Sequence, residues 1–446
     1  MPGLKAAVEP ALPLTPRRRD AVIFLRGRRA VPVGEFLAEV AGVAALLPER
    51  GPALNICADR YLALVGFAAS LSRGHVTLLS ADRSAARLEE LAARHGAAYA
   101  VTDQPGALPV PAVPLDGAAL PAVAGAAAPA IPAARIAAVA FTSGSTGEPM
   151  PHAKSWGALV ACAEAAAERF GLAGPETTSV IGTVPPQHMY GFETTVVLPL
   201  HAAVAGHAGP VFYPSDIAEA LAGAPAPRLL VTTPLQLRAQ LDAPMPPLRA
   251  VISATAPLGA ELAEQAERRW ETRVLEIYGA TEVGSIASRR TLDGEGWLPY
   301  RGIGLDIAEE GAMVRVPGLP EPVPLADAVE WMGEGRFRLL GRRADLVKLA
   351  GKRASLAALN RVLTAIEGVE DGVFLAPEDL ARNPAARLAA LVVAPGRRPE
   401  EILAALRGRL DPAFLPRPIL LVPALPRNEL GKLSRSALLA LTQGPA

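Results

Sequence analysis

The chain contains few cysteines, few lysines and few aromatic residues. Its 446 residues include two cysteines (Cys57 and Cys162), 4% aromatic residues, and five lysines among 44 basic residues. The two cysteines are far apart and have no histidine or cysteine neighbours at ligand spacing, which argues against a disulfide framework and a zinc site. We therefore expect a cytoplasmic protein whose cysteines lie in the core.

The chain has no charged-then-apolar leader, and prolines interrupt its alanine-rich run at residues 117–134. We therefore expect neither export nor a membrane span. A hydrophobic content of 50% with balanced charges, 44 Lys+Arg against 44 Asp+Glu, predicts a globular chain of two or three domains.

The charge is unevenly distributed along the chain. After residue 342 there are 15 basic and 10 acidic residues, or +5, which leaves 29 against 34, or −5, for residues 1–342. This pattern argues against a nucleic-acid-binding body. It predicts a small basic C-terminal domain that could meet an anionic partner, although charges that serve only solvation remain the simpler reading for most of these residues.

The chain also lacks a Walker A loop. Residues 142–149 read Thr-Ser-Gly-Ser-Thr-Gly-Glu-Pro, without the Gly-Lys-Ser/Thr ending of that motif. The backbone N–H groups and four hydroxyls of this stretch nevertheless suit phosphate oxygens. Taken alone, the stretch fits a Ser/Gly surface loop equally well.

The hydrophobic pattern predicts an α/β fold. Short apolar runs at residues 54–57, 75–79 and 98–102 alternate with amphipathic stretches at 61–72 and 84–95, a pattern typical of a layered parallel sheet. The pattern continues with a strand at 136–141, a helix at 155–169, strands at 179–183, 229–232, 249–252 and 273–277, and a helix at 258–269. We expect the Ala/Pro-rich residues 105–132 to form a linker or a surface crossing.

The last third of the chain has a different pattern. Residues 311–340 show short alternating runs with Gly and Pro turns, which predict β-hairpins, and the remainder carries its own strands and helices. The predicted fold is thus a large N-terminal α/β domain of layered sheets and helices with a β-hairpin region, residues 1–341. A small α+β C-terminal domain, residues 342–446, follows a hinge at residues 342–345.

The positions of the rare lysines are a further indication. Four of the five, Lys154, Lys348, Lys352 and Lys432, lie in or beside the motifs of this chain. Because an ammonium and a guanidinium are not interchangeable at a reaction centre, lysines in an arginine-rich chain favour a functional role.

Several segments in order resemble the adenylate-forming superfamily, which includes acyl-CoA synthetases, nonribosomal-peptide adenylation domains and beetle luciferases. The similarity spans residues 136–435. It is carried by residues 142–147, by Pro-Pro-Gln-His-Met-Tyr-Gly-Phe at 185–192, by Ser-Ala-Thr-Ala-Pro at 253–257, by Tyr-Gly-Ala-Thr-Glu at 278–282, by Gly341-Arg342 and by Gly431-Lys432.

The resemblance implies roles for individual residues in activating a carboxylate with ATP. The pyrophosphate loop would comprise Thr142, Ser143, Gly144, Ser145, Thr146 and Gly147, and the adenine site Thr255, Ala256, Tyr278 and Gly279. Thr281 and Glu282 would contact the acyl phosphate, with Glu282 also the Mg²⁺ ligand. Asp327 and Arg342 would hold the ribose, His188 would gate the acyl pocket, and Lys432 would be the catalytic lysine.

These roles agree with the chemistry of the reaction. Attack of a carboxylate on the α-phosphate of ATP brings anions together, so Mg²⁺, an ammonium and backbone donors must offset the charge. Taken singly, Glu282 could be an exposed loop acid, Asp327 a turn residue, and His188 a structural histidine. Tyr190 and Phe192 could be core aromatics.

The sequence departs from the family pattern at several positions. Met150 stands where a lysine commonly follows the loop proline, and whether Lys154 supplies that charge is open. The adenine segment lacks its usual glycines, Leu-Ala precedes Asp327 in place of Thr-Gly, and Ala344 stands where the hinge often has an acidic residue.

Two functions remain open at this point. The chain is a ligase that forms an acyl-AMP and transfers the acyl group to a phosphopantetheine thiol, or it is a catalytically reduced adenylate-binding module that acts as an assembly partner. Retention of Glu282 and Lys432 favours the ligase. Its substrate would be an aryl or fatty acyl carboxylic acid, and its cofactors ATP, Mg²⁺, and CoA or the phosphopantetheine of a carrier protein.

A carrier protein is the favoured acceptor. The segment after the glycine-rich loop resembles ligases of bacterial pigment and polyene pathways, which load aryl or acyl acids onto carrier proteins. Lys348, Lys352 and Arg353, around Gly351, would form a basic rim suited to the acidic helix of a carrier protein or to the phosphate of CoA.

Overall fold

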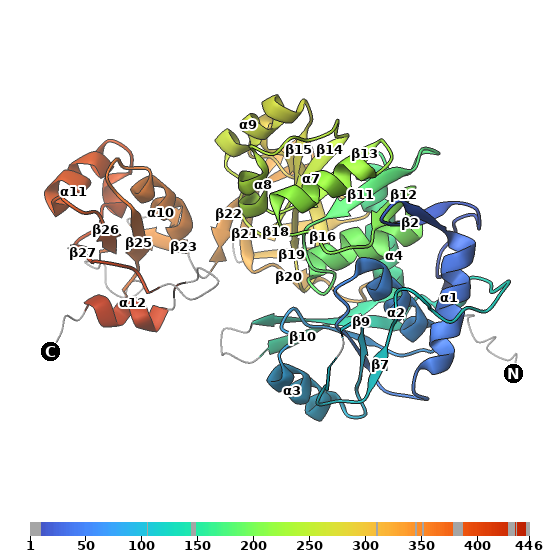
Figure 1. Ribbon diagram of the computed structural model, residues 1–446. Coiled ribbons are helices and arrows are strands. Elements are labelled where there is room, and N and C mark those ends of the chain that lie inside the picture. Colours follow the sequence, from blue (N-terminus) through green and yellow to red (C-terminus); the bar gives the residue numbers. More distant parts are fainter. Residues whose placement is uncertain are drawn as a thin grey trace, which may run out of the picture. The chain divides into compact units, whose positions relative to one another are not determined.

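The computed structural model describes residues 10–104, 106–143, 149–308, 311–343, 346–349, 352–377, 387–426, 433 and 435–442 (Figure 1). By their contacts the residues divide into two units. The first comprises Met1–Asp306, Met313–Val323 and Gly333–Arg336, and the second comprises Ile307–Ala312, Pro324–Met332 and Phe337–Ala446.

The first unit contains two large sheets. A nine-stranded sheet has the order β17-β16-β15-β14-β13-β11-β12-β2-β3, and a six-stranded sheet has the order β10-β9-β5-β4-β6-β7. Their strands are β2 (Val22–Arg26), β3 (Arg29–Pro32), β4 (Ala53–Asn55), β5 (Thr77–Leu79), β6 (Tyr99–Thr102), β7 (Ala112–Pro114), β9 (Ile136–Ser143), β10 (Pro149–Ser155), β11 (Thr178–Gly182), β12 (Val204–His207), β13 (Arg228–Thr232), β14 (Ala250–Ser253), β15 (Val274–Ala280), β16 (Gly284–Arg290) and β17 (Leu298–Pro299). A separate pair joins β1 (Ala11–Pro13) to β8 (Ala130–Pro132).

Both sheets are parallel at their centres; the larger is antiparallel at both edges, and the smaller only where β10 pairs with β9. In the larger sheet β2, β12, β11, β13, β14 and β15 run parallel, while β15–β16, β16–β17 and β2–β3 are antiparallel. Parallel strands need covering helices on both faces, which explains their nearly continuous runs of buried residues.

Apolar helices fill the space between the two sheets. They are α1 (Val33–Leu46), α2 (Arg60–Ser72), α4 (Trp156–Arg169) and the continuous stretch of α5 (Met189–Gly191), the π-helix η1 (Phe192–Val197) and α6 (Leu198–His201) (Figure 1). All residues of α2 from Arg60 to Leu71 are buried, as expected for a helix that is apolar on every side. Phe67 of α2 packs against Phe192 and Trp156, with ring centroids 5.0 and 6.4 Å apart.

Helices with a single apolar face cover the outer sides of the sheets. They are α3 (Ala85–His95) on the smaller sheet, and α7 (Pro214–Gly223), α8 (Pro234–Gln240) and α9 (Ala260–Trp270) on the larger one. In α3 only Leu88 and Leu91 are buried, which is the narrow stripe of an amphipathic surface helix.

The second unit has its own core. A three-stranded sheet of β25 (Asp371–Leu375), β26 (Ala389–Val393) and β27 (Ile419–Leu421) packs against α10 (Leu356–Thr364) and α11 (Pro399–Arg407), while Leu438 of α12 (Arg435–Thr442) belongs to a second cluster with β25 and β26. Hairpins β21–β22 (Asp327–Gly333, Arg336–Arg342) and β23–β24 (Leu346–Leu349, Lys352–Ser355) precede this sheet. Along the sequence, between β17 and β21, the chain forms a three-stranded sheet of β18 (Gly304–Ala308), β19 (Gly311–Arg315) and β20 (Val323–Pro324).

The predicted α/β class with layered sheets is confirmed, and the predicted strands and helices lie within a few residues of the observed ones. Some elements differ from the prediction. The Ala/Pro-rich residues 105–132 contribute two three-residue strands, β7 and β8, which pair with β6 and β1. The helical stretch at 189–201, of which residues 192–197 are π-helical, was not predicted, because its residues are buried almost all round and so show no helical period.

His201 gives the fold a testable acid sensitivity. Its ring packs on Trp156 with centroids 5.3 Å apart, and burial lowers its pKa from 6.5 to about 4. The folded state favours the neutral imidazole of His201. Its contribution to the free energy of unfolding is therefore fully present above the pKa of the unfolded chain, about 6.5, and is lost as the pH falls from there towards 4. At pH 5 the loss is about 2 kcal/mol.

We expect the variant His201→Phe, which keeps the aromatic packing, to be less acid-sensitive than the wild type. Urea unfolding at pH 7 and pH 5 should show the wild-type free energy of unfolding falling by about 2 kcal/mol more than that of the variant. An equal fall in the two proteins would assign the acid sensitivity to other groups.

Candidate active site

The motif segments of the first unit follow the carboxyl ends of neighbouring parallel strands. Residues 183–188 follow β11, residues 254–257 follow β14, and residues 281–283 follow β15, with β11, β13, β14 and β15 adjacent in the sheet. Open α/β sheets bind ligands at this edge. The fold therefore brings His188, Thr255, Ala256, Tyr278 and Glu282, which are distant in sequence, to one edge of one sheet.

Thr281 and Glu282 lie in the turn that joins β15 to the antiparallel β16. The turn is closed by the Val283 N–H, which donates to the Ala280 carbonyl oxygen at 3.1 Å, and both Thr281 and Glu282 are half-buried. Gly279 is required by this geometry, since a Cβ there would lie 2.4 Å from the Gly284 carbonyl oxygen.

Lys154 holds this turn from a different sheet. It lies on β10, its residue is only 3% exposed, and its Nζ donates to the Glu282 carbonyl oxygen at 2.8 Å. Burial lowers the pKa of Lys154, and the carboxylate of Glu193 is the largest of the influences that oppose this shift. Lys154 thus fixes the main chain of the residue that is the candidate magnesium ligand.

Glu193 is the centre of a buried polar cluster next to the turn. Its carboxylate oxygens accept hydrogen bonds from the Ser285 backbone N–H at 3.2 Å, from the Ser285 hydroxyl, and from the Cys162 thiol at 3.7 Å. Burial raises the pKa of Glu193, against the opposing hydrogen bond from Ser285 and the charge of Lys154. A Cβ at Gly284, whose φ is +78°, would lie 2.5 Å from the Glu193 Oε1 atom, so this cluster also requires glycine at that position.

Thr255 carries backbone strain at the sheet edge. It is exposed, and its φ is +79°, a value that a β-branched residue adopts only at a cost on the order of 1–3 kcal/mol. Such strain is concentrated at ligand sites. Thr255 thus stands at a position whose positive φ a glycine would adopt without strain, in the segment that lacks the family's usual glycines.

Tyr278, the candidate adenine-stacking residue, is buried in this structure. Its ring lies against Trp297 with centroids 5.6 Å apart, and the Arg289 guanidinium lies 4.6 Å from the Trp297 ring centroid. The aromatic pair fixes the end of β15 and with it the position from which the turn begins.

His188 caps a helix at the same edge. It is exposed, and its Nδ1 accepts the Tyr190 backbone N–H at 3.3 Å, which makes it the N-cap of α5. Two hydrogen bonds fix the loop that precedes His188. Gln187 Nε2 donates to the Cys57 carbonyl oxygen at 2.6 Å, and the guanidinium of the buried Arg60 donates to the Val184 carbonyl oxygen at 3.1 Å. Tyr190 and Phe192 are core residues, both buried.

The candidate pyrophosphate loop lies between two antiparallel strands. Thr142 and Ser143 end β9 and pair with Met150 and Pro149 of β10. Gly144, Ser145, Thr146 and Gly147 lie outside the described residues. The helix predicted at 155–169 is present as α4 (Trp156–Arg169), and strand β10, which was not predicted, lies between it and this loop.

Met150, which replaces the usual loop lysine, is 56% exposed on β10, whereas Lys154 is turned inward to the Glu282 turn. The ammonium of Lys154 is therefore buried against the Glu282 turn, and the exposed position of the usual loop lysine is occupied by Met150.

The second unit brings the two candidate ribose residues together. Asp327 begins β21 and Arg342 ends β22, and the Arg343 N–H donates to the Ala326 carbonyl oxygen at 2.9 Å, so the two ends are adjacent. Lys432, Gly351, Ala344 and Asp345 lie outside the described residues. Lys352 forms an ion pair with Asp411, while Lys348 is exposed.

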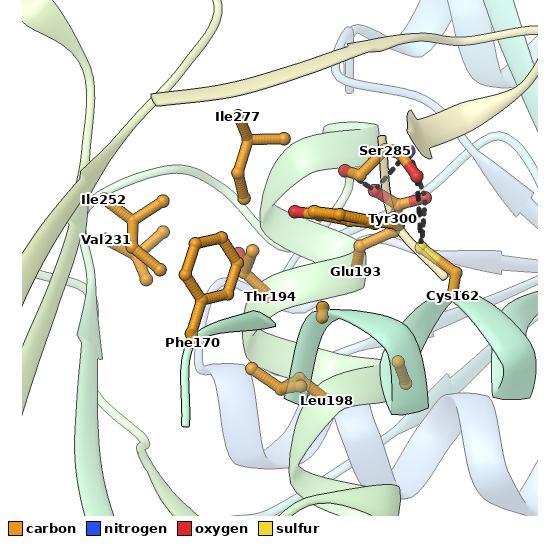
Figure 2. A pocket seen from close by; sticks show the side chains of 12 residues that line it. Cys162, Phe170, Glu193, Thr194, Leu198, Val231, Ile252, Ile277, Ser285 and Tyr300 are labelled. Atoms are coloured by element: carbon orange, nitrogen blue, oxygen red, sulfur yellow. Dashed lines mark hydrogen bonds between the residues drawn. The ribbon is translucent and has the colours of Figure 1, made fainter. Parts of the chain in front are cut away.

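A small cavity of about 10 Å³ is lined in part by Ile277 of β15 and Ser285 of β16, the two strands that flank the Glu282 turn (Figure 2). This volume holds roughly one water molecule. The cavity is lined by Cys162, Ala163, Ala166 and Phe170 near α4, by Glu193, Thr194 and Leu198, and by Val231, Ile252, Ile277, Ser285 and Tyr300.

No sequence motif pointed to four polar residues of this cavity, Glu193, Thr194, Ser285 and Tyr300. A signal existed for Glu193, because it is the only charged residue in the apolar and hydroxyl run of residues 189–200. Both cysteines were expected in the core; Cys57 is buried, whereas Cys162 is half-buried beside Glu193.

Within the described ranges, no group of three or more His, Cys, Asp or Glu side chains could hold a metal ion. None of the helices in those ranges has the length and apolarity needed to cross a membrane. Mg²⁺ is commonly held by one or two carboxylates together with substrate phosphates, so the half-buried Glu282 turn fits this ion as a partial site.

Comparisons with known proteins agree with this arrangement. Residues 16–326 match the family described as AMP-binding enzyme. The chain is 31% identical over 310 residues to a 4-coumarate–CoA ligase of Halorhodospira halophila, covering 66% of this chain and 73% of the relative. A 4-coumarate–CoA ligase of Rhodobacter capsulatus is 33% identical over 235 residues, 52% of this chain and 59% of that protein.

Solved structures share the fold over nearly the whole chain. ATP-bound MatB from Rhodopseudomonas palustris superposes with a TM-score of 0.76 at 20% identity, covering 96% of this chain and 97% of that one. The o-succinylbenzoate–CoA synthetase MenE of Bacillus subtilis, in complex with AMP, gives a TM-score of 0.76 at 18% identity and covers 96% and 98%. The chain therefore belongs to the AMP-binding enzymes of the adenylate-forming superfamily and is an ATP-dependent ligase of the acid–thiol type.

Proposed function

We propose that this protein joins a carboxylic acid to ATP, releasing pyrophosphate and forming an acyl-AMP, and then transfers the acyl group to a phosphopantetheine thiol. The observation that carries the proposal is the Glu282 turn at the carboxyl edge of the large sheet, held by the buried Lys154 from a second sheet. A surface loop acid without function would not need an inward lysine to fix its main chain.

Residues of this edge and residues of the β21–β22 hairpin are the proposed nucleotide contacts. Thr255 and Ala256 are exposed beside the end of β15 and would face the adenine, with Tyr278 and Gly279 forming the adjacent wall. Asp327 and Arg342, whose main chains are adjacent, would hold the two ribose hydroxyls. The loop of Thr142, Ser143, Gly144, Ser145, Thr146 and Gly147 would bind the pyrophosphate.

Glu282 would be the protein ligand of Mg²⁺, and Thr281 would donate to the acyl phosphate. When bound, the ion would offset charge on the phosphates as the carboxylate attacks. Lys432, on the proposed small domain of residues 342–446, would supply the ammonium that stabilises the same charge, and His188 would face the acid.

We also propose that the two half-reactions use different orientations of the small domain, with rotation at residues 342–345. Lys432 must leave the site before a thiol can enter, because both approach the acyl-AMP. A domain motion of this kind would let the lysine and the thiol use the same position beside the acyl-AMP at different times.

The acceptor is either CoA or a carrier protein, which present the same thiol. The sequence favours a carrier protein, whereas the relatives bear CoA in their names. The ion pair between Lys352 and Asp411 removes one charge from the expected basic rim. Exposed Lys348 remains available to either anionic partner.

The test is a two-stage assay with the full-length protein. Pyrophosphate release with a panel of aryl and fatty acids and Mg²⁺ should identify acids that are adenylated. Each acid found is then offered CoA or a holo-carrier protein, and thioester yield is measured. Release without transfer to either thiol would contradict the ligase assignment, and no release with any acid would favour the reduced adenylate-binding module.

A further inference from the structure

Glu193 is a buried carboxylate that is not among the proposed contacts of ATP, acid or thiol. It lies on the π-helical stretch η1 and is 8% exposed. A buried carboxylate is costly unless it is paired and hydrogen-bonded, and π-helical turns occur frequently at functional sites. The charge at this position is therefore expected to have a use beyond packing.

The carboxylate holds the first residues of β16 by hydrogen bonds. The Ser285 N–H lies 3.2 Å from both of its oxygens, the Ser285 hydroxyl donates to Oε2, and the Cys162 thiol of α4 lies 3.7 Å from Oε1 (Figure 2). Hydrogen bonds to an ionised acceptor are about twice as strong as those between neutral groups. Ser285 is the third residue after Glu282, so these bonds fix the main chain where it leaves the turn.

The ladder between β15 and β16 is interrupted next to these bonds. Gly279 is opposite Ser285, whereas the preceding Tyr278 is opposite Ala287. Ile286 is thus an extra residue of β16, a β-bulge, and two residue pairs lie between it and the turn. Because a bulge disrupts the ladder locally, the position of the turn depends on bonds from outside the hairpin, and the carboxylate supplies such a bond.

The helix that carries Glu193 begins at His188, the residue proposed to face the acid. His188 is the N-cap of α5, which continues without a break into η1. The Thr194 hydroxyl donates to the Tyr190 carbonyl oxygen at 2.6 Å, and the Tyr190 hydroxyl donates to the main chain of β14 at 2.9 Å. One carboxylate thus connects the acid-facing helix with the strand that leaves the Glu282 turn.

Lys154 bonds the same turn from β10 and carries the opposite charge. Its Nζ donates to the Glu282 carbonyl oxygen at 2.8 Å. Burial lowers the pKa of Lys154 and raises that of Glu193, and in each case the charge of the other residue opposes the shift. The two buried charges therefore stabilise each other, while their hydrogen bonds fix different parts of the hairpin. The lysine fixes the turn itself, and the carboxylate fixes the strand that follows it.

We propose that Glu193 is a positioning residue for adenylation, which joins the helix that faces the acid to the turn that would hold Mg²⁺, so that one connected unit binds both ligands. The inference rests on the proposed function, because it assigns the acid to His188 and Mg²⁺ to Glu282. Loss of the carboxylate should then weaken the binding of both ligands. Loss of Lys154, which bonds the turn alone, should weaken the binding of Mg²⁺.

The principal variant is Glu193→Gln, which keeps the size of the side chain and removes its charge and one acceptor. Calorimetry with the full-length protein measures two values. One is the Mg²⁺ concentration for half-maximal binding of α,β-methylene-ATP, and the other is the Kd of the acid that the pyrophosphate assay shows to be adenylated best. We expect each value to rise about tenfold, as for the loss of one hydrogen bond to a charged group. In Lys154→Met only the Mg²⁺ value should rise.

Two further variants separate positioning from stability. Glu267→Gln is the matched control, because Glu267 is also buried and pairs with Arg290 of β16, but from α9 and at the end of the strand away from the turn. It should lower the melting temperature and leave both values unchanged. Ser285→Ala removes one donor and keeps the charge, so it should raise both values by a smaller factor, about fivefold.

The double variant Lys154→Met/Glu193→Gln removes both buried charges, so it should be more stable than either single variant and still bind both ligands weakly. Recovery of binding together with stability would overturn the proposal. A Glu193→Gln protein with both values unchanged, or with only one of them raised, would overturn it too and leave the ligase function standing. No adenylation of any acid and no Mg²⁺-dependent binding of the nucleotide by the wild type would overturn the proposed function, and this inference with it.

Discussion

Replacing Lys432 by alanine is expected to lower acyl-adenylate formation by a factor on the order of 10² or more. The ammonium would stabilise the charge that builds on the carboxylate and the α-phosphate during attack, and single electrostatic groups of this kind contribute about 10²–10³ in rate. The measurement is pyrophosphate release with the best acid at saturating ATP and Mg²⁺. Transfer from supplied acyl-AMP to the thiol should be much less affected, because Lys432 would already have left the site.

The control for Lys432→Ala is Arg407→Ala, which removes a positive charge from the last turn of α11 in the same unit. This control should adenylate the acid at close to the wild-type rate. Normal adenylation by Lys432→Ala itself would contradict the mechanism, whatever the effect on transfer.

Replacing Lys154 by methionine should lower adenylation by roughly 10- to 100-fold, less than the about 10²–10³-fold cost of losing a donor aimed at the transition state, because Lys154 acts through the main chain of Glu282. Methionine fills similar space, but it leaves the Glu282 carbonyl oxygen without its lysine donor and leaves Glu193 without the nearby positive charge. Because the turn would then be less well positioned, the Mg²⁺ concentration for half-maximal rate should rise. A merely structural lysine would lower the melting temperature and leave that concentration unchanged.

The matched control for Lys154→Met is Arg268→Met. It removes a cation from the exposed face of α9, where the Arg268 side chain is 69% exposed and pairs only at the surface with Glu264. It should leave both the rate and the Mg²⁺ dependence unchanged. A wild-type Mg²⁺ dependence in Lys154→Met would argue that the lysine supports the fold alone.

The sequence was sufficient for the layers and the motif order, because both have local signals. Apolar runs alternating with amphipathic stretches predicted the parallel strands β4, β5 and β6 and the helices α2 and α3, and the Tyr-Gly-Ala-Thr-Glu stretch marked the turn after β15. The site residues that local patterns predicted are those that lie at the ends of strands.

The rest could not be predicted because it depends on contacts between distant segments. The helix at 189–201 is buried on every side and has no polar face to give it a period. The sequence left open whether Lys154 replaces the loop lysine, and only its place on β10, paired with β9, shows that it turns inward to the Glu282 turn. Tyr300 lies in no motif, and its burial depends on packing against segments that are distant in the sequence.

The large sheet has a consequence for how the chain is made. Strand β2 lies beside β12, with Phe24 opposite Gly206, and Thr15 and Arg17 bond the main chain at Leu200, Pro199 and Val204. These partners emerge from the ribosome about 180 residues later, which at roughly 5–20 residues per second is a wait of roughly 10–35 s. During that interval β2 can pair only with β3, which follows it directly, and its other edge is unpaired, so nascent chains of this protein should depend on chaperone occupancy of this hairpin.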